Sequence, residues 1–116
     1  MIGQLLVGLI AVLHVYILVL EMFLWDKPAG LKAFANTPEK AQLTKVLAQN
    51  QGLYNGFLAA GLFWSLIAPE TYAVALANFF LGCVLIAGIY GGLTASKKII
   101  YIQSIPAVIA LIAVNF

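Results

Sequence analysis

His14 and Glu21 are the two residues whose types and spacing could do acid-base chemistry in the long apolar stretch that opens the chain. They are seven residues apart, which in an α-helix is two turns less about 20°, so both would lie on one face about 10 Å apart. Ionisable side chains in such a stretch are costly and point to function. A carboxyl group there is expected to be neutral, paired or wetted by a cavity. His14 and Glu21 are therefore candidates for handling a proton or binding a ligand.

Polar residues of the later apolar stretches extend this candidate site. Most of them lie in the halves of their stretches that are nearest the lysine-bearing connections, as Glu21 does. This asymmetry predicts a polar pocket with His14 at its floor, opening to the side of the lysines. The further candidates for ligand binding or proton handling are Gln51, Tyr54, Asn55, Tyr90 and Gln103. The alternative is structural, because amides and tyrosines often only form hydrogen bonds across a helix bundle, each worth about 0.6 kcal/mol.

Several other chemistries are excluded by the residue types. One histidine and one cysteine, Cys83, cannot supply a zinc site or two haem ligands, so we expect no metal and no cofactor. The glycines between 88 and 92 stand inside an apolar run and do not make a phosphate loop. There is no arginine, and the six lysines flank apolar segments rather than forming a basic patch with aromatics, so nucleic-acid binding is excluded.

The elements that must position these side chains are membrane-spanning helices. Of 116 residues, 64% are hydrophobic and only 9% are charged, whereas soluble domains carry roughly a quarter charged residues. A spanning helix needs about 20 apolar residues. Four stretches qualify, at about residues 2–25, 49–68, 71–95 and 99–116. We therefore predict an all-α bundle of four transmembrane helices, a single integral membrane domain over residues 1–116, with membrane lipids around it and a kink at Pro106.

The lysines predict which way the bundle faces. Four lie in the connection at about residues 26–48 and two lie at positions 97 and 98, while the connection between the second and third spans has only Glu70. The positive-inside rule then places residues 26–48 in the cytoplasm and both termini on the extracytoplasmic side of a plasma or inner membrane. Within the long connection, Thr37, Pro38 and Glu39 predict the start of a helix, from the N-cap residue, the first-turn proline and the acid.

Small residues predict close contacts between helices. Gly52, Gly56 and Ala60 recur every four residues, and Gly88 and Gly92 form a second pair. Such ridges let another backbone approach closely. Because one small bundle does not obviously need both ridges, we also expect a homodimer.

Several blocks of residues resemble a known family. They are His14-Val15-Tyr16 with residues 20–25, the block from Asn50 to Gly61, the run from Phe79 to Cys83 continuing to Gly91, and Gln103 with Pro106. Together they resemble a family of small bacterial membrane proteins catalogued as domain of unknown function 1304. The resemblance covers essentially the whole chain, and the block from Asn50 to Gly61 is specific. It implies a four-span fold and no activity.

Three functions are compatible with these observations. The first is a protein that binds or transports a small, hydrophobic or lipid-like ligand, with Glu21 coupling a proton or cation. The second is a small membrane enzyme acting on a lipid or isoprenoid-like substrate, with Glu21 and His14 as acid and base. The third is a structural or accessory subunit that packs on a partner through its glycine ridges.

Overall fold

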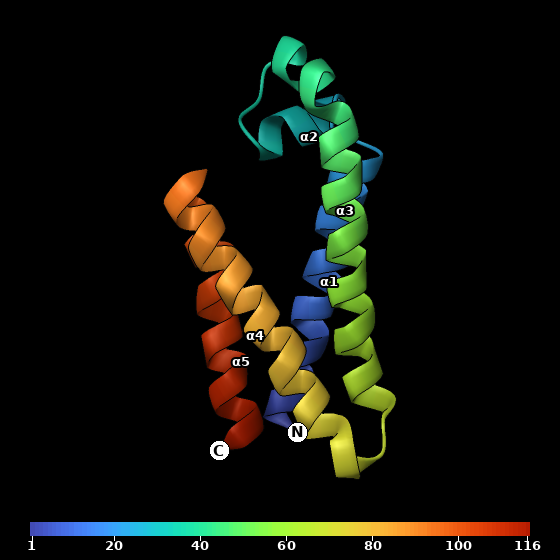
Figure 1. Ribbon diagram of the computed structural model, residues 1–116, viewed down its shortest axis with the longest axis vertical. Helices are drawn as coiled ribbons and strands as arrows, with labels where there is room; N and C mark the ends of the chain where they lie inside the picture. Colours follow the sequence, from blue (N-terminus) through green and yellow to red (C-terminus); the bar gives the residue numbers. More distant parts are fainter. The chain divides into compact units, whose positions relative to one another are not determined.

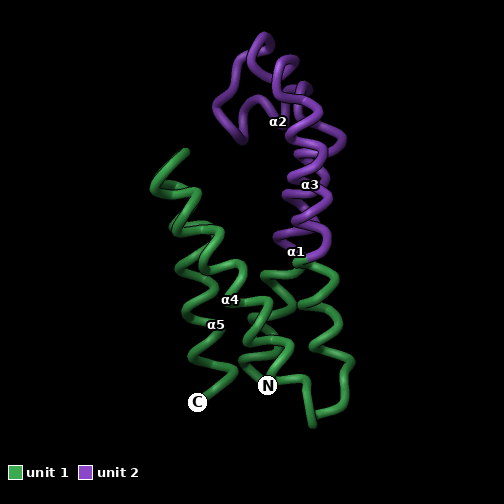
Figure 2. The backbone as a smooth tube through the Cα atoms, in the orientation of Figure 1, with its two compact units in different colours: residues 1–11, 58–116 green, residues 12–57 purple.

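The protein is all-helical, as the sequence predicts. A computed structural model describes residues 1–116, which form five α-helices and one π-helical segment and no strand. The elements are α1 (Ile2–Met22), α2 (Pro28–Ala33), α3 (Pro38–Ile67), α4 (Glu70–Thr94), η1 (Ile100–Ser104) and α5 (Ile105–Asn115) (Figure 1). The chain divides into two compact units: unit 1 holds Met1–Ala11 and Leu58–Phe116, and unit 2 holds Val12–Phe57 (Figure 2).

Two of the helices are long and apolar enough to cross a membrane. They are α1, with 21 residues, and α4, with 25 residues. The 30-residue α3 is longer than either, but its middle carries the amides Asn50, Gln51 and Asn55, and its first turns carry lysines. The C-terminal apolar stretch Ile100–Asn115 is shorter. Length and composition therefore single out α1 and α4.

Helix α3 begins at Pro38, where the sequence predicts a helix start. The backbone N–H of Lys40 donates a hydrogen bond to Thr37 Oγ1 at 3.2 Å, which caps the first turn. From there α3 continues without a break to Ile67. The stretch predicted to begin near residue 49 is thus the C-terminal part of a longer helix, because nothing between Pro38 and Gln49 interrupts helical hydrogen bonding.

The short helix α2 was not predicted from the sequence. It begins at Pro28, whose missing N–H suits the first turn of a helix. Its Gly30 is buried against the end of the preceding segment. A Cβ at this position would collide with the carbonyl oxygen of Leu24, so this close contact requires glycine. After α2, Ala35 takes a left-handed backbone conformation, with φ of 49°, and turns the chain toward α3.

The core of unit 1 is built from four helices and consists of small and branched side chains. Its buried residues are Val7, Ile10 and Ala11 of α1, Leu62 of α3, Ala77, Leu81 and Val84 of α4, and Ala107 and Ala110 of α5. The alanines of α5 let its backbone lie near its neighbours, so dispersion contacts accumulate over the whole length of the contact. This core holds together the ends of helices that are far apart in the sequence.

The sequence predicts a kink at Pro106, and the structure has a π-helical segment just before this residue. Pro106 has no N–H, so the carbonyl four residues earlier loses its normal donor. The residues before Pro106 form the π-helical η1, in which the N–H of Ile105 donates a hydrogen bond to the carbonyl of Ile100, five residues back. Ser104, which is buried, donates its hydroxyl to the carbonyl of Leu85 in α4 at 3.0 Å. The irregular turn is therefore anchored to α4.

Gly88 and Gly92 make this anchoring contact possible. A Cβ at Gly88 would collide with Ser104 Oγ and lie 2.8 Å from the Ser104 backbone nitrogen, and a Cβ at Gly92 would collide with the Ile100 side chain. Both glycines are thus used within one chain, against η1. The homodimer, which was inferred partly from this pair, has no support from these contacts.

We expect Gly88→Ala to destabilise the protein by about 1–3 kcal/mol, because the methyl group overpacks the contact with the Ser104 backbone. Gly82 is the matched control: it lies on the same helix, and a Cβ there would meet nothing within 4 Å. Gly82→Ala should instead stabilise the helix by about 0.5–1 kcal/mol through lower unfolded-state entropy. Thermal unfolding in detergent measures both changes. Equal shifts for the two variants would contradict the assigned role of Gly88.

Candidate functional site

Glu21 lies in the last turn of α1 with its carboxylate bound by two side-chain amides of α3. Gln51 Nε2 donates to Glu21 Oε2 at 2.7 Å, and Asn55 Nδ2 donates to Oε1 at 2.6 Å. Glu21 is only 1% exposed and Asn55 is 8% exposed. Because Gln51 and Asn55 are one helical turn apart, their amides lie one above the other and each reaches one oxygen. All three residues belong to unit 2.

Two glycines of α3 allow the backbone approach that these hydrogen bonds need. A Cβ at Gly52 would lie 2.5 Å from Met22 Cγ and 3.2 Å from the Leu18 carbonyl oxygen. A Cβ at Gly56 would lie 2.7 Å from Leu18 Cδ1. Ala60, the third member of the predicted ridge, is exposed. The close contact within unit 2 therefore involves Gly52 and Gly56, and it places the flanking Gln51 and Asn55 beside Glu21.

The carboxylate has neutral donors and no lysine at hydrogen-bonding distance. The chain's ion pair is elsewhere, between Lys45 Nζ and Asp26 Oδ2 at 3.0 Å. Two amide hydrogen bonds replace part of the lost hydration of a buried carboxylate, but they bring no compensating charge. Such a group is suited to take up a proton, a cation or a ligand that donates hydrogen bonds.

The remaining predicted site residues do not all join this cluster. His14 is fully buried on α1, and its seven-residue separation from Glu21 corresponds to about 10 Å along the helix. Tyr54 is 66% exposed and has its ring against Phe57, with centroids 5.8 Å apart. Tyr90 is 71% exposed on α4, and Gln103 is half-buried on η1, both in unit 1.

The separation between His14 and Glu21 bears on the acid-base interpretation. A general acid and the group that it serves must come within hydrogen-bond reach, about 2.6–3.2 Å. Residues seven apart on one helix are about 10 Å apart along its axis, whereas the amides of Gln51 and Asn55 lie 2.7 and 2.6 Å from the Glu21 oxygens. The geometry therefore favours the cluster of Glu21 with Gln51 and Asn55 over a pair of Glu21 with His14.

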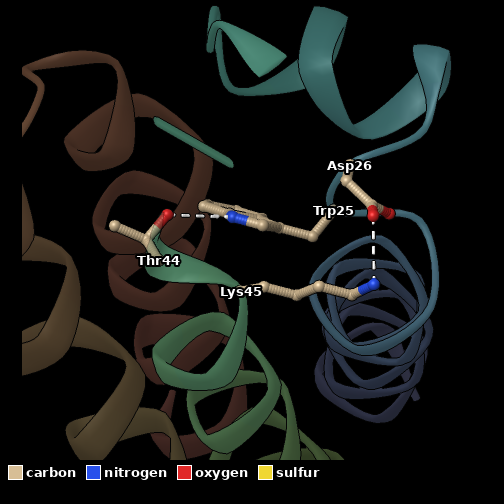
Figure 3. A network of polar contacts seen from close by, with 4 residues as sticks. All are labelled: Trp25, Asp26, Thr44 and Lys45. Carbon is tan, nitrogen blue, oxygen red and sulfur yellow. Dashed lines mark hydrogen bonds and ion pairs between the residues drawn. The ribbon is translucent and has the colours of Figure 1, made fainter. Parts of the chain in front are cut away.

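A second polar network of unit 2 was missed in the sequence. Trp25 Nε1 donates to Thr44 Oγ1 at 3.1 Å, and Lys45 forms the ion pair with Asp26 (Figure 3). The Trp25 ring also lies against Phe34, with centroids 4.8 Å apart. The hydrogen bond from Lys45, together with its positive charge, holds the pKa of Asp26 below its usual value. This network joins the segment after α1 to α3 almost two turns before Gln51.

The signal for this network lies in the antiparallel register of α1 and α3. Because α1 and α3 run antiparallel, residues that follow Glu21 lie opposite residues that precede Gln51. Trp25 and Asp26 are therefore expected to lie opposite residues a few positions before Leu47. The register itself was not available from residue spacing, because Asp26 and Lys45 are 19 positions apart. Sequence reasoning therefore assigned the lysines to topology alone.

We expect Asn55→Ala to destabilise the fold by about 1–3 kcal/mol, because it removes the donor of a buried carboxylate oxygen. Asn50→Ala is the matched control, since Asn50 is an exposed amide on the same helix and should change stability by less than about 0.5 kcal/mol. Thermal unfolding in detergent compares the two. A similar loss in both variants would show that the hydrogen bond to Glu21 contributes nothing specific.

Comparisons with known proteins place the chain in a family without assigning an activity. Residues 8–115 match the family described as protein of unknown function (DUF1304). The chain is 31% identical over 110 residues to the uncharacterized protein YpaA of Lactococcus lactis subsp. lactis (strain IL1403), covering 93% of this chain and 92% of that relative. No solved structure matches it. The chain belongs to the DUF1304 family, as the blocks from His14 to Gln103 suggest.

Proposed function

We propose that this protein is a four-span protein of the plasma or inner membrane that binds a small or lipid-like ligand at Glu21, in the cytoplasmic half of a four-helix bundle. The observation that carries the proposal is the Glu21 carboxylate, 1% exposed and bound by two neutral amides at 2.6 and 2.7 Å. A buried ionisable group near the end of an apolar helix is a functional feature by default. Sites between the helices of a bundle are a common placement for ligands.

The length of α1 supports this depth for Glu21. Its 21 residues make a helix of about 31 Å, close to the thickness of about 30 Å of a hydrocarbon core. If this core begins near Ile2, it ends near Met22. Trp25 then falls in the interfacial layer, where tryptophans are enriched, and Glu21 lies just inside the boundary.

The same placement in the membrane explains the exposed side chains on the first turns of α3. The hydrogen bond between Trp25 and Thr44 sets Thr44 at the interfacial level. The neighbouring Leu43, Val46 and Leu47 are 84%, 70% and 69% exposed, with Lys40 and Lys45 beside them. Aliphatic groups next to lysines suit the boundary between acyl chains and head groups, because lysine side chains extend their charge outward. Exposed aliphatic side chains at this level support the membrane placement.

Access to the carboxylate passes through Gln51. Asn55 is buried, whereas Gln51 is exposed, and both amides occupy the space next to the carboxylate oxygens. A ligand with a hydroxyl or ammonium group can replace the Gln51 donor at Glu21 Oε2 if the Gln51 side chain rotates outward. The exchange keeps the carboxylate hydrogen-bonded throughout, which avoids the cost of an unsatisfied buried group. Gln51 is thus the residue that would separate the ligand from the site.

We expect wild-type protein, purified in a mild detergent, to retain a lipid-like ligand that Glu21→Gln loses. Glutamine is nearly isosteric, but its amide offers one acceptor oxygen in place of two. Native mass spectrometry compares the bound species, and thermal unfolding confirms that the variant is folded. Asn78→Ala is the control, because Asn78 exchanges hydrogen bonds with Asn115 in unit 1. Equal retention by Glu21→Gln and wild type would refute the site.

The four-span topology predicts opposite labelling of two single cysteines. In a Cys83→Ala background, Ala35→Cys should react from the cytoplasmic side and Glu70→Cys from the outside, since both positions are exposed. A membrane-impermeant thiol reagent applied to intact cells and to inverted vesicles measures the two sides. The four-span topology has one span between the two positions. Labelling of both cysteines from one side would require an even number of spans between them and would contradict this topology.

A further inference from the structure

The segment between the end of α1 and the middle of α3 carries lysines that have no carboxylate partner. Residues 26–48 contain four lysines and two carboxylates. One lysine is used within the chain, because Lys45 forms the ion pair with Asp26. The other carboxylate, Glu39, is exposed in the first turn of α3. The lysines that are exposed and form no ion pair are Lys27, Lys32 and Lys40. The segment therefore presents net positive charge to its surroundings.

Two contacts of Trp25 bring lysine-bearing helix ends together. The Trp25 ring lies against Phe34, which directly follows the last turn of α2, and this turn carries Lys32. The indole N–H donates to Thr44 Oγ1 at 3.1 Å, and Thr44 is about one turn after Lys40 on α3 (Figure 3). Lys32 and Lys40 therefore belong to the same end of unit 2 as Trp25.

Exposed aliphatic side chains follow Lys40 along α3. Leu43 and Leu47 are three and seven residues after Lys40, so the three side chains lie on one face of the helix. The two leucines are 84% and 69% exposed. At about 1.5 Å per residue, Lys40 lies about 6 Å outside Thr44, which the proposed membrane placement sets at the interface. Together with Lys32, the residues Lys40, Leu43 and Leu47 form the interfacial surface of unit 2.

The order of charge and apolar area on this surface matches a phospholipid. The polar layer on each side of a hydrocarbon core is about 5–7 Å thick, so the Lys40 ammonium group lies at the depth of lipid phosphates. Leu43 and Leu47 lie deeper, at the level of the first methylene groups of the acyl chains. A water-soluble polyanion would leave these leucines uncovered. A zwitterionic phospholipid carries an ammonium group that cancels its attraction to lysines, whereas an anionic phospholipid keeps it.

We propose that the interfacial surface binds anionic phospholipids of the cytoplasmic leaflet. The lysines contact the phosphate group, and the leucines contact the acyl chains. Glu39 opposes the binding, but one carboxylate faces three unpaired lysines, so the attraction prevails. The inference rests on the membrane placement proposed above and is independent of any ligand at Glu21.

The test uses Trp25 as a reporter, because its indole contacts Thr44, which lies between the two leucines in the sequence. The chain has two tryptophans, so Trp64→Phe leaves Trp25 as the only one, and every variant carries this change. The full chain is reconstituted into equimolar vesicles of phosphatidylglycerol and phosphatidylcholine, with bromine on the acyl chains of one lipid or the other. Bromine quenches tryptophan fluorescence at short range, so the two quenching values give the lipid composition near Trp25.

We expect phosphatidylglycerol to be enriched at least about fivefold over phosphatidylcholine near the reporter, which is the attraction of an anionic surface for one lysine. Lys32→Gln combined with Lys40→Gln should lower the enrichment to less than about twofold, because both unpaired charges of the surface are removed. The matched control is Lys97→Gln combined with Lys98→Gln, which removes the same charge from unit 1 and should leave the enrichment unchanged.

The outcomes separate this proposal from the membrane placement. Equal quenching by the two brominated lipids, or an enrichment that survives Lys32→Gln with Lys40→Gln, overturns the lipid site alone. An equal loss in the Lys97 and Lys98 control also overturns it, because the preference would then follow the net charge of the chain. No quenching by either lipid places Trp25 outside the bilayer interface, which contradicts the membrane placement and the lipid site together.

Discussion

The close approach of α3 to the end of α1 is the constraint on which unit 2 depends. Gly52 and Gly56 have no side chain to separate the two helices, so Leu18 and Met22 lie directly against the α3 backbone. At that separation the amides of Gln51 and Asn55 reach Glu21, and further along the pair Thr44 and Lys45 reach Trp25 and Asp26. A larger residue at Gly52 would push α3 away and leave a buried carboxylate without donors, which is far more costly than the lost packing alone.

Unit 1 also depends on small residues, which in this unit allow the close packing of α4 against η1 and do not position an ionisable side chain. Gly88 admits Ser104, whose hydroxyl satisfies the Leu85 carbonyl and ties the π-helical turn to α4. Pro106 has no N–H, and the turn before it is widened so that the N–H of Ile105 bonds to the carbonyl of Ile100. The widened turn redistributes the backbone hydrogen bonds, and the glycine gives the space that the widened turn needs.

Glu21 and Glu70 illustrate how the surroundings decide what a carboxylate can do. Glu21 is buried, and its two oxygens already accept hydrogen bonds from the chain, so any ligand must exchange with an existing donor. Glu70 is exposed in the first turn of α4, where water and the N-terminus of the helix stabilise its charge. The first carboxylate therefore depends on specific partners within the protein, whereas the second does not.

The sequence by itself determined the helical class and the start of α3 at Pro38, it pointed to a perturbed helix around Pro106, and it singled out Glu21 as a candidate site residue. These follow from local chemistry: the N-cap at Thr37, the missing N–H of proline, and the cost of a charge in an apolar helix. Only the tertiary structure decided that Gln51 and Asn55 bind Glu21 while Tyr54 points away, and that Gly88 packs on Ser104. Those facts depend on the register and spacing between helices, which are set by packing among residues distant in the chain and leave no trace in residue periodicity.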